Sequence, residues 1–318
     1  YESPAYYTWV PFHSFAGFNA GHLVWDDFLP IFTLLEMFGM LEEGGMIPLL
    51  TRYVLKDDAL WATCDSREEN KNKCAHLFNK FLPAFHVEPS TFSTTDDFVF
   101  QPKLQQQSNY VCAKHGAAGL AMLTDHGVKA HGWEPDDYTT THNMGRGPVL
   151  YAFRNFMLEN LGIPTRTSLQ APYNVIFSKF SSRSGKRSTG FEPQLQVVQE
   201  EFDSSIINAR GLVMQRLSFH EQAKLASEAS VWITSCGGGA VTATFLPRGS
   251  SLILYYDPKG SLVRNKPKYT PARLDWDLFN HLSHVRVHWF PTTDMNSPAS
   301  LKLLVELIKS ELRVIQHF

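Results

Sequence analysis

The stretch that most constrains the fold is a strand, a run of three glycines and a second strand within residues 230–256. An apolar run at 231–233 is followed, after three more residues, by Gly237, Gly238 and Gly239. A second apolar run covers 252–256. Glycines at the carboxyl end of a strand let a ligand approach the backbone. A helix beginning at Gly239 or Ala240 adds N–H groups and a positive dipole end. The turn therefore predicts a binding site for an anion, most simply a diphosphate. The spacing of its glycines matches neither the Rossmann nor the Walker motif.

The second half of the chain alternates strands with helices. We expect strands at 174–178, 212–215, 231–234 and 251–255, helices at 194–202 and 219–228, and a short helix at 240–245. This alternation is typical of a parallel sheet covered by helices, in which ligands bind outside the carboxyl ends of the strands. An amphipathic helix is expected at 300–314.

The first half is less regular. Apolar spacing predicts a helix over 22–40, in which Pro30 causes a kink or a start near Leu29. Short strands are expected at 48–55, 98–100 and 110–113, and polar stretches at 66–73 and 125–137. A helix over 147–161 ends at Gly162. The 318 residues suffice for about two domains, and we place them at 1–160 and 161–318.

Charge and hydropathy exclude several classes of partner. The net charge is −2 without a sustained basic stripe, so nucleic-acid binding is not expected. A local basic cluster has the size of a phosphate site; it contains Lys179, Arg183, Lys186 and Arg187. No run reaches the ~18 apolar residues of a membrane span. Membrane attachment is therefore expected only through an anchor outside this chain.

The four cysteines are Cys64, Cys74, Cys112 and Cys236, and no two of them form a C-x-x-C pair. A structural zinc site is therefore not expected. Cys64 and Cys74 flank a charged loop and are candidates for a disulfide in an oxidising compartment. Free thiols remain the alternative.

Three motifs in register carry a resemblance to a known family. The pattern N-x-x-H-x-x-x-D-x-x-x-P-L-F is met by Asn19, His22, Asp26, Pro30 and Phe32, with Ile31 in place of leucine. The patterns S-F-x-E-Q and F-L-P-x-G are met at 218–222 and 245–249, and S-R-x-x-x-R is met in part by Ser178, Lys179 and Arg183. The chain thus resembles the family 61 glycosyltransferases, in particular the protein O-mannose N-acetylglucosaminyltransferase branch and its plant xylosyl- and arabinosyltransferase relatives.

The resemblance implies a GT-B architecture of the α/β class, with two Rossmann-like domains facing across a cleft. It implies an inverting, metal-independent transfer from a UDP-sugar to a hydroxyl of a glycan or glycoprotein, without a cofactor. UDP-GlcNAc is the first donor expected, and UDP-xylose and UDP-arabinose remain alternatives. The implied location is the lumen of the Golgi or endoplasmic reticulum.

The resemblance also suggests roles for individual residues. His22 and Asp26 are the candidate catalytic pair, a base oriented by a carboxylate, because residues four apart share a helix face; bracing of a domain interface is the alternative. The donor candidates are Ser178, Lys179, Arg183, Glu221, Cys236, Gly237, Gly238 and Gly239. Glu221 suits ribose hydroxyls, or a capping box with Ser218. Arg146 is a further candidate phosphate contact, and Asn19 is expected to fix a turn.

Two positions depart from the family pattern. Cys236 stands where the H-G-A-G motif has histidine, and Lys179 stands where the basic motif has its first arginine. Cysteine does not reproduce an imidazole hydrogen bond, and lysine loses the bidentate geometry of arginine. A catalytically inactive relative that binds glycans or acts as a scaffold is therefore the competing hypothesis.

Overall fold

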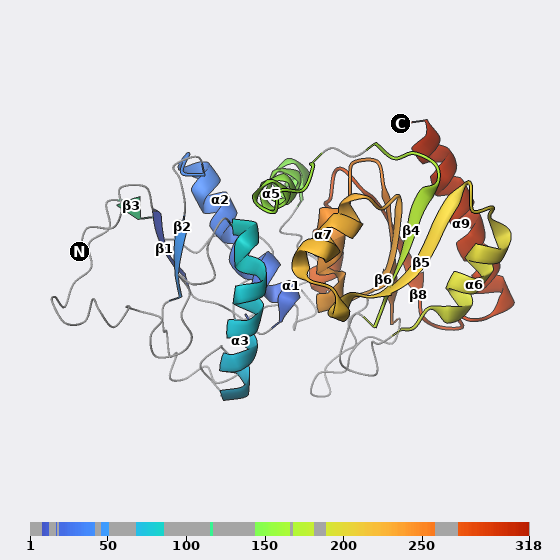
Figure 1. Ribbon diagram of the computed structural model, residues 1–318, viewed down its shortest axis with the longest axis horizontal. Coiled ribbons are helices and arrows are strands. Elements are labelled where there is room, and N and C mark those ends of the chain that lie inside the picture. Colours follow the sequence, from blue (N-terminus) through green and yellow to red (C-terminus); the bar gives the residue numbers. More distant parts are fainter. Residues whose placement is uncertain are drawn as a thin grey trace. The chain divides into compact units, whose positions relative to one another are not determined.

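The structure, a computed structural model, describes residues 8–12, 17, 19–41, 46–50, 68–85, 115–116, 144–165, 168–180, 189–257 and 273–317. The chain divides into two compact units. The first contains Tyr1–Val128 and Glu159–Gly162, and the second contains Lys129–Leu158 and Ile163–Phe318. Each unit is described by itself (Figure 1). The predicted domain boundary between residues 160 and 161 stays a prediction.

The first unit has a three-stranded parallel sheet in the order β2-β1-β3 among its described residues. Its strands are β1 (Thr8–Phe12), β2 (Met46–Leu50) and β3 (His115–Gly116). The sequence predicted a strand near β2 but not β1 or β3. The strands predicted at 98–100 and 110–113, and the polar stretch at 125–137, lie outside the described residues.

The long helix predicted over 22–40 is present, and its irregularity has a defined form. It consists of α1 (Ala20–His22), the π-helical segment η1 (Leu23–Phe28) and α2 (Leu29–Met37). The Leu29 N–H donates to the Val24 carbonyl, five residues back, so the wider turn is complete before Pro30. Pro30 then lies in the first turn of α2, where a missing N–H costs no helical bond.

The polar stretch predicted at 66–73 is largely helical, which corrects that expectation. The helix α3 covers Glu68–Phe81 and continues into the 3₁₀ turn η2 (Leu82–Phe85). The following turns bury Cys74, Phe78 and Phe85, and the rings of Phe28 and Phe85 are 4.4 Å apart. Tertiary packing of the second half of α3 therefore outweighs its polar beginning. Cys74 is disulfide-bonded, as the sequence suggested, whereas Cys236 is not part of a disulfide, and the other two cysteines lie outside the described residues.

The second unit contains the predicted parallel sheet. It has five strands in the order β5-β4-β6-β7-β8, and all neighbours are parallel. Its strands are β4 (Tyr173–Lys179), β5 (Ile207–Val213), β6 (Val231–Ser235), β7 (Ser251–Tyr256) and β8 (Arg286–Pro291). The strand predicted at 212–215 begins five residues earlier as β5, and residues 214–216 form the 3₁₀ turn η6 (Met214–Arg216). β8 was not predicted.

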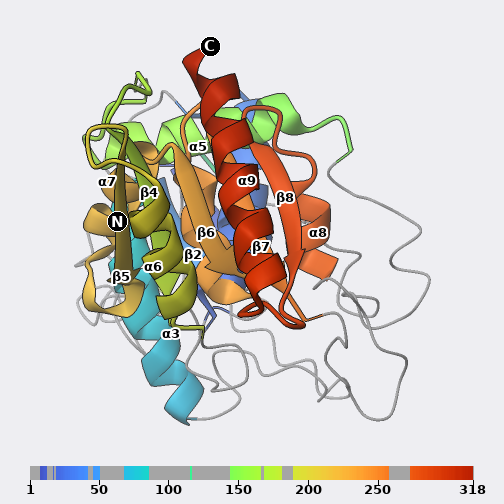
Figure 2. The ribbon, with the colours of Figure 1, turned by 90° about the vertical axis from the view of Figure 1, so that its right-hand side faces the viewer.

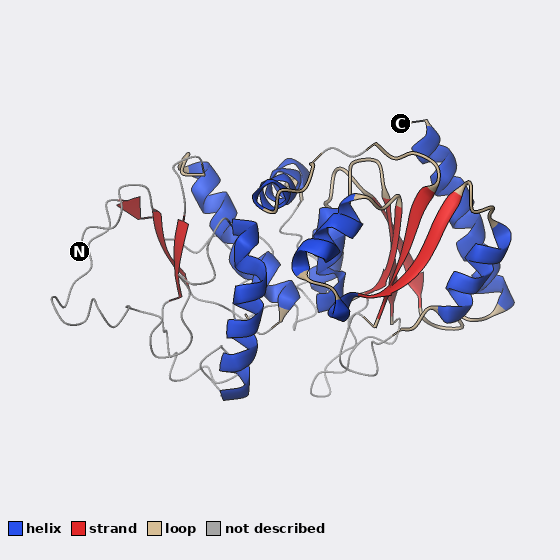
Figure 3. Cartoon of the chain, viewed as in Figure 1, coloured by secondary structure: helices blue, strands red, loops and turns tan. Residues whose placement is uncertain are grey.

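Helices cover both faces of this sheet (Figure 3). The helices described between residues 147 and 316 are α5 (Gly147–Asn160), α6 (Glu192–Glu201), α7 (Phe219–Ser227), η7 (Gly238–Phe245, 3₁₀), α8 (Arg273–Phe279) and α9 (Pro298–Gln316). All except α8 were predicted to within a few residues. Figures 1 and 2 show α6 and α9 together on one face and α7 on the other. Val231, Ile233 and Tyr255 meet α9 at Ile308 and Leu312 in one apolar core.

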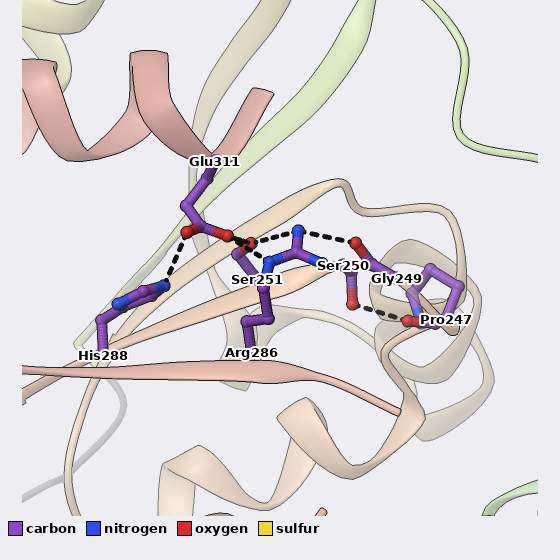
Figure 4. Close-up of polar contacts among 7 residues, drawn as sticks. All are labelled: Pro247, Gly249, Ser250, Ser251, Arg286, His288 and Glu311. Atoms are coloured by element: carbon purple, nitrogen blue, oxygen red, sulfur yellow. Dashed lines mark hydrogen bonds and ion pairs between the residues drawn. The ribbon is translucent and has the colours of Figure 1, made fainter. Parts of the chain in front are cut away.

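A buried carboxylate fastens α9 to the amino edge of the sheet (Figure 4). Glu311 of α9 is 5% exposed and accepts hydrogen bonds from the Ser251 hydroxyl and, at 2.6 Å, from Arg286 Nε. His288 Nε2 lies 3.0 Å from its other oxygen. Burial alone raises the pKa of Glu311, but the bonds from His288, Ser251 and Arg286 outweigh it and hold the pKa at about 2. The carboxylate thereby positions the first residues of β7 and β8.

Candidate functional site

The strand order places a topological switch point between β4 and β6. β4 is followed in sequence by its neighbour on one side, β5, and the chain then crosses to β6 on the other side. Ligands of open parallel sheets bind outside the carboxyl ends of the strands at such a point. Phe177 pairs with Ile233, so Ser178 and Lys179 end β4 beside the end of β6. The predicted donor residues of both segments are therefore brought to one edge.

Thr189 joins the two strand ends. Its hydroxyl oxygen accepts a hydrogen bond from Ser235 Oγ at 3.0 Å, at the end of β6. Its carbonyl accepts from the Phe180 N–H at 3.1 Å, just after β4. The threonine thus fixes the spacing between the two parts of the site.

Lys179 is positioned by its neighbours on β5 and α6. Its ammonium lies 3.2 Å from the Glu192 carboxylate, and its side chain is 16% exposed whereas that of Glu192 is 64% exposed. Gly211 of β5 leaves room for the lysine stem, since a Cβ there would lie 2.2 Å from Lys179 Cε. Lys179 is therefore a directed cation with one exposed acidic partner.

Ser178 presents an unusual hydroxyl at the same strand end. The residue is fully buried, and its Oγ has no hydrogen-bond partner. A buried hydroxyl without a partner carries a desolvation cost. Its position beside Lys179 makes it a candidate ligand contact.

The glycine turn follows β6. The Cys236 N–H donates to the Tyr255 carbonyl at 2.9 Å, which continues the sheet one residue beyond the strand. Gly237 has φ 120° and ψ −173°, a conformation open to glycine and strained for other residues. The helix η7 then begins at Gly238, one or two residues before the predicted start, and the first N–H groups of a helix have no intrahelical partner. The turn thus places the first N–H groups of η7 directly after the end of β6.

An aspartate already contacts this turn. Asp275 of α8 is 3% exposed, and its Oδ1 accepts the Gly237 N–H at 3.2 Å. Asp275 was not among the predicted site residues, because its helix α8 was not predicted either. The contact shows that the turn receives a carboxylate oxygen, the same kind of acceptor that a phosphate presents.

Glu221 forms the capping box with Ser218. The Ser218 N–H and Oγ both contact Glu221 Oε2, at 2.7 and 2.8 Å, and these bonds lower the pKa of the carboxyl group. The capping bonds therefore use one of the two carboxylate oxygens, and Oε1 remains for a hydroxyl ligand. The next residue, Gln222, is buried and joins α7 to η7 by accepting from Thr242 Oγ1 at 3.2 Å.

Three aromatic side chains lie beside the ends of β7 and β8. The rings of Trp276 and Trp289 are 5.2 Å apart, and those of Tyr256 and Trp289 are 6.3 Å apart. Trp289 Nε1 donates to Asn280 Oδ1 at 2.8 Å. Half-buried aromatic rings are suited to stacking against a base or a sugar. The high aromatic content of the chain was the one sequence signal for this cluster.

The predicted catalytic pair lies in the first unit, at the α1–η1 junction. His22 Nδ1 and Asp26 Oδ2 are 2.6 Å apart, with side chains 22% and 7% exposed. Asn19 caps this helix, since its Oδ1 accepts the Gly21 N–H at 3.0 Å. The expected turn and the expected pairing are both present, and the catalytic role stays a prediction.

Other predicted residues do not join this group. Arg183 lies outside the described residues, as do Lys186 and Arg187. Arg146 precedes Gly147, which packs against Ser283 near the opposite edge of the sheet. Within the described ranges, no three His, Cys, Asp or Glu side chains gather in a group able to hold a metal ion. In the same ranges, no helix has the length and apolar character to span a membrane.

Comparison with known proteins gives distant relatives. The chain is 21% identical over 257 residues to the protein O-linked-mannose beta-1,4-N-acetylglucosaminyltransferase 2 of dog, chimpanzee and human. The match covers 80% of this chain and 37% of each relative, so the chain spans little more than a third of their length. No family model matches the chain. The chain is thus distantly similar to these three transferases across both of its units.

Proposed function

We propose that the protein is a glycosyltransferase that moves a sugar from a UDP-sugar to a hydroxyl group of a glycan or glycoprotein. UDP-GlcNAc is the first candidate donor because the similar proteins are named as N-acetylglucosaminyltransferases. UDP-xylose and UDP-arabinose are the next candidates. The proposal includes a GT-B arrangement and an inverting transfer that uses neither a metal nor a cofactor.

One observation carries the proposal. The motifs that resemble the donor-binding motifs of family 61, at 178–179 and 236–239, lie at the ends of neighbouring strands β4 and β6. They are 57 residues apart in sequence (236 − 179 = 57), and the fold brings them to the switch point of the sheet. This is where an open parallel sheet binds its ligand.

The residues of the second unit suit a nucleoside diphosphate. Lys179 and the N–H groups at the start of η7 would hold the phosphates and stabilise the charge that builds on the leaving diphosphate. Glu221 Oε1 would accept a ribose hydroxyl. Ser178 would contribute its hydroxyl, and Arg183 would add a second cation.

The first unit would supply the acceptor side. His22 would take the proton of the acceptor hydroxyl through Nε2, because Nδ1 is bonded to Asp26. Asp26 would orient the imidazole and stabilise its protonated form.

The disulfide of Cys74 supports a location in an oxidising compartment. Together with the named relatives, it favours the lumen of the Golgi or endoplasmic reticulum.

Isothermal titration with UDP, followed by hydrolysis assays across UDP-GlcNAc, UDP-xylose and UDP-arabinose, tests the proposal. Saturable UDP binding and turnover of one donor would support it. Absence of binding to any nucleoside diphosphate would contradict it.

The competing function is that of an inactive relative, and Cys236 is the observation that favours it. Cys236 is half-buried and is not part of a disulfide, at the position where the family pattern has histidine. UDP binding without turnover would support this alternative. Cys236→His would then restore transfer if the missing imidazole is the cause, with Cys236→Ser as the matched control.

A further inference from the structure

A second basic cluster lies at the amino edge of the sheet in the second unit. Arg154 of α5 is fully buried, and His284, just before β8, is 6% exposed. Arg248 lies in the turn before β7 and is exposed. The Gly249 N–H donates to the His284 carbonyl at 2.8 Å, which joins the segments that carry Arg248 and His284. The switch point described above is at the other ends of these strands.

The first turns of α5 close this cluster. The rings of Tyr151 and His284 are 4.8 Å apart, and the Arg154 guanidinium lies 5.6 Å from the centroid of the Tyr151 ring. Gly147 packs so tightly on the segment before His284 that a Cβ would lie 2.4 Å from Ser283 Cβ. α5 and the segment preceding β8 thus form two sides of one site.

The buried polar atoms of the cluster are incompletely satisfied. Arg154 Nε donates to the Phe245 carbonyl at 3.2 Å, and Nη1 donates to the Thr165 carbonyl at 2.9 Å and to Asn155 Oδ1 at 2.6 Å. Arg154 Nη2 and both ring nitrogens of His284 have no partner, and the same is true of Nη1 in neighbouring Arg146. Buried polar groups normally have hydrogen-bond partners. A buried group without a partner destabilises the fold, and the cost is greatest when the group is charged.

The charges in the cluster have one sign. Among the described residues, no carboxylate forms an ion pair with Arg146, Arg154, Arg248 or His284. Burial, with further contributions from Arg154 and Arg248, lowers the pKa of His284 to about 3. Burial likewise lowers the pKa of Arg154 to about 10. An anion would satisfy both the unpaired donors and the excess positive charge.

We propose that Arg154, Arg248 and His284 form a binding site for an oxyanion, of which phosphate is the simplest example. Tetrahedral phosphate presents several acceptor oxygens, which suits donors carried by α5 and by the adjoining segments before β7 and β8. The ligand is either a free anion or a phosphate group carried by a sugar. The site is independent of the proposed UDP-sugar site, because it uses other residues at the opposite edge of the sheet.

Titration of the full chain with inorganic phosphate at constant ionic strength, with chloride as the balancing salt, tests this site. Saturable binding is expected, and Arg248→Ala should weaken it about tenfold through loss of a charge-assisted contact. Arg313→Ala, which removes an exposed arginine of α9, is the matched control and should bind phosphate as the wild type does. His284→Gln provides a second variant inside the cluster and should also weaken binding.

Two results would overturn the proposal. One is the absence of saturable phosphate binding beyond that of chloride. The other is unchanged affinity in both Arg248→Ala and His284→Gln. Loss of phosphate binding in Lys179→Ala, with Arg248→Ala unaffected, would also overturn it by placing the anion at the other edge.

The same variants separate this site from the proposed function. Arg248→Ala should leave UDP affinity unchanged, so failure of UDP binding and failure of phosphate binding are separate outcomes. Glucose 6-phosphate, compared with glucose and with inorganic phosphate, distinguishes a phosphosugar from a free anion. Tighter binding of the phosphosugar would support the former, and tighter binding of inorganic phosphate the latter.

Discussion

Lys179 shows how neighbouring residues hold a single side chain in place. Its stem fills the space over Gly211, and its ammonium is directed by Glu192. Lysine retains the positive charge that arginine supplies in the family pattern. It binds a phosphate through a single ammonium group, however, whereas arginine can donate two parallel hydrogen bonds.

Lys179→Ala should weaken UDP binding by about tenfold or more, because a charge-assisted hydrogen bond contributes roughly 1.5–3 kcal/mol. Isothermal titration measures the effect. Lys302→Ala, at an exposed lysine of α9, is the control and should bind as the wild type does. Equal UDP affinity in the two variants would remove Lys179 from the donor site.

Single residues also mark the limit of sequence reasoning. Ser218 and Glu221 were predicted correctly as a capping box, and the bond from side chain to backbone expected of Asn19 is present, because these bonds join residues two or three positions apart. Asp275 was missed because its contact with Gly237 spans 38 residues and depends on the tertiary fold. Local hydrogen bonding is readable from sequence, whereas contacts between distant segments are not.

At the scale of elements, burial explains which strands and helices were predicted. β4, β6 and β7 each contain an uninterrupted apolar run of at least three residues and were found. β8 carries Arg286 and His288, which weaken the apolar signal of the strand, and both side chains contact Glu311 of α9 in the fold. α3 was missed because its first turns are polar, and its buried side begins near Cys74.

The junction of α9 with the sheet predicts an acid-sensitive stability. The Glu311 pKa is about 2 in the folded protein against 4.5 for an ordinary glutamate, so the folded state favours the carboxylate. The stabilisation is therefore fully present above about pH 4.5 and is lost as the pH falls toward 2. Its size is at most about 3 kcal/mol, because a tenfold difference in proton affinity between the folded and unfolded states corresponds to about 1.4 kcal/mol.

Urea unfolding between pH 3 and pH 7 measures this contribution. Glu311→Gln should unfold more easily than the wild type at pH 7 and should show a weaker dependence on pH between 5 and 3. Glu306→Gln, at an exposed site on the same helix, is the control. Parallel pH profiles for wild type and Glu311→Gln would show that the network contributes no pH-dependent stability.

At the scale of the molecule, the two units have different means of stabilisation. The first contains the disulfide-bonded Cys74, and the second contains the five-stranded sheet and the proposed donor site. The parallel sheet of the second unit could be predicted because its strands and helices alternate regularly. The described part of the first unit was predicted in its long helix and near β2, whereas β1 and β3 were missed because such short strands carry weak periodic signals.

Calorimetry should therefore resolve two unfolding transitions. Reduction of the disulfide should lower the Tm of one of them by several degrees, since loss of such a bond typically costs about 2–5 kcal/mol. UDP at about 100 times its Kd should raise the Tm of the other transition, because a ligand at this concentration stabilises the folded state by about 2.7 kcal/mol. A single transition that responds to both treatments would show that the units unfold cooperatively.

The two acidic contacts at the switch point have a consequence for turnover. Glu192 holds Lys179 and Asp275 holds the amide of Gly237, so both groups already have a negative partner. In the proposed reaction, an arriving diphosphate would exchange with these carboxylates, which would then repel it from close range. Such a built-in competitor would lower the affinity for the nucleotide product and shorten the time for which that product occupies the proposed site.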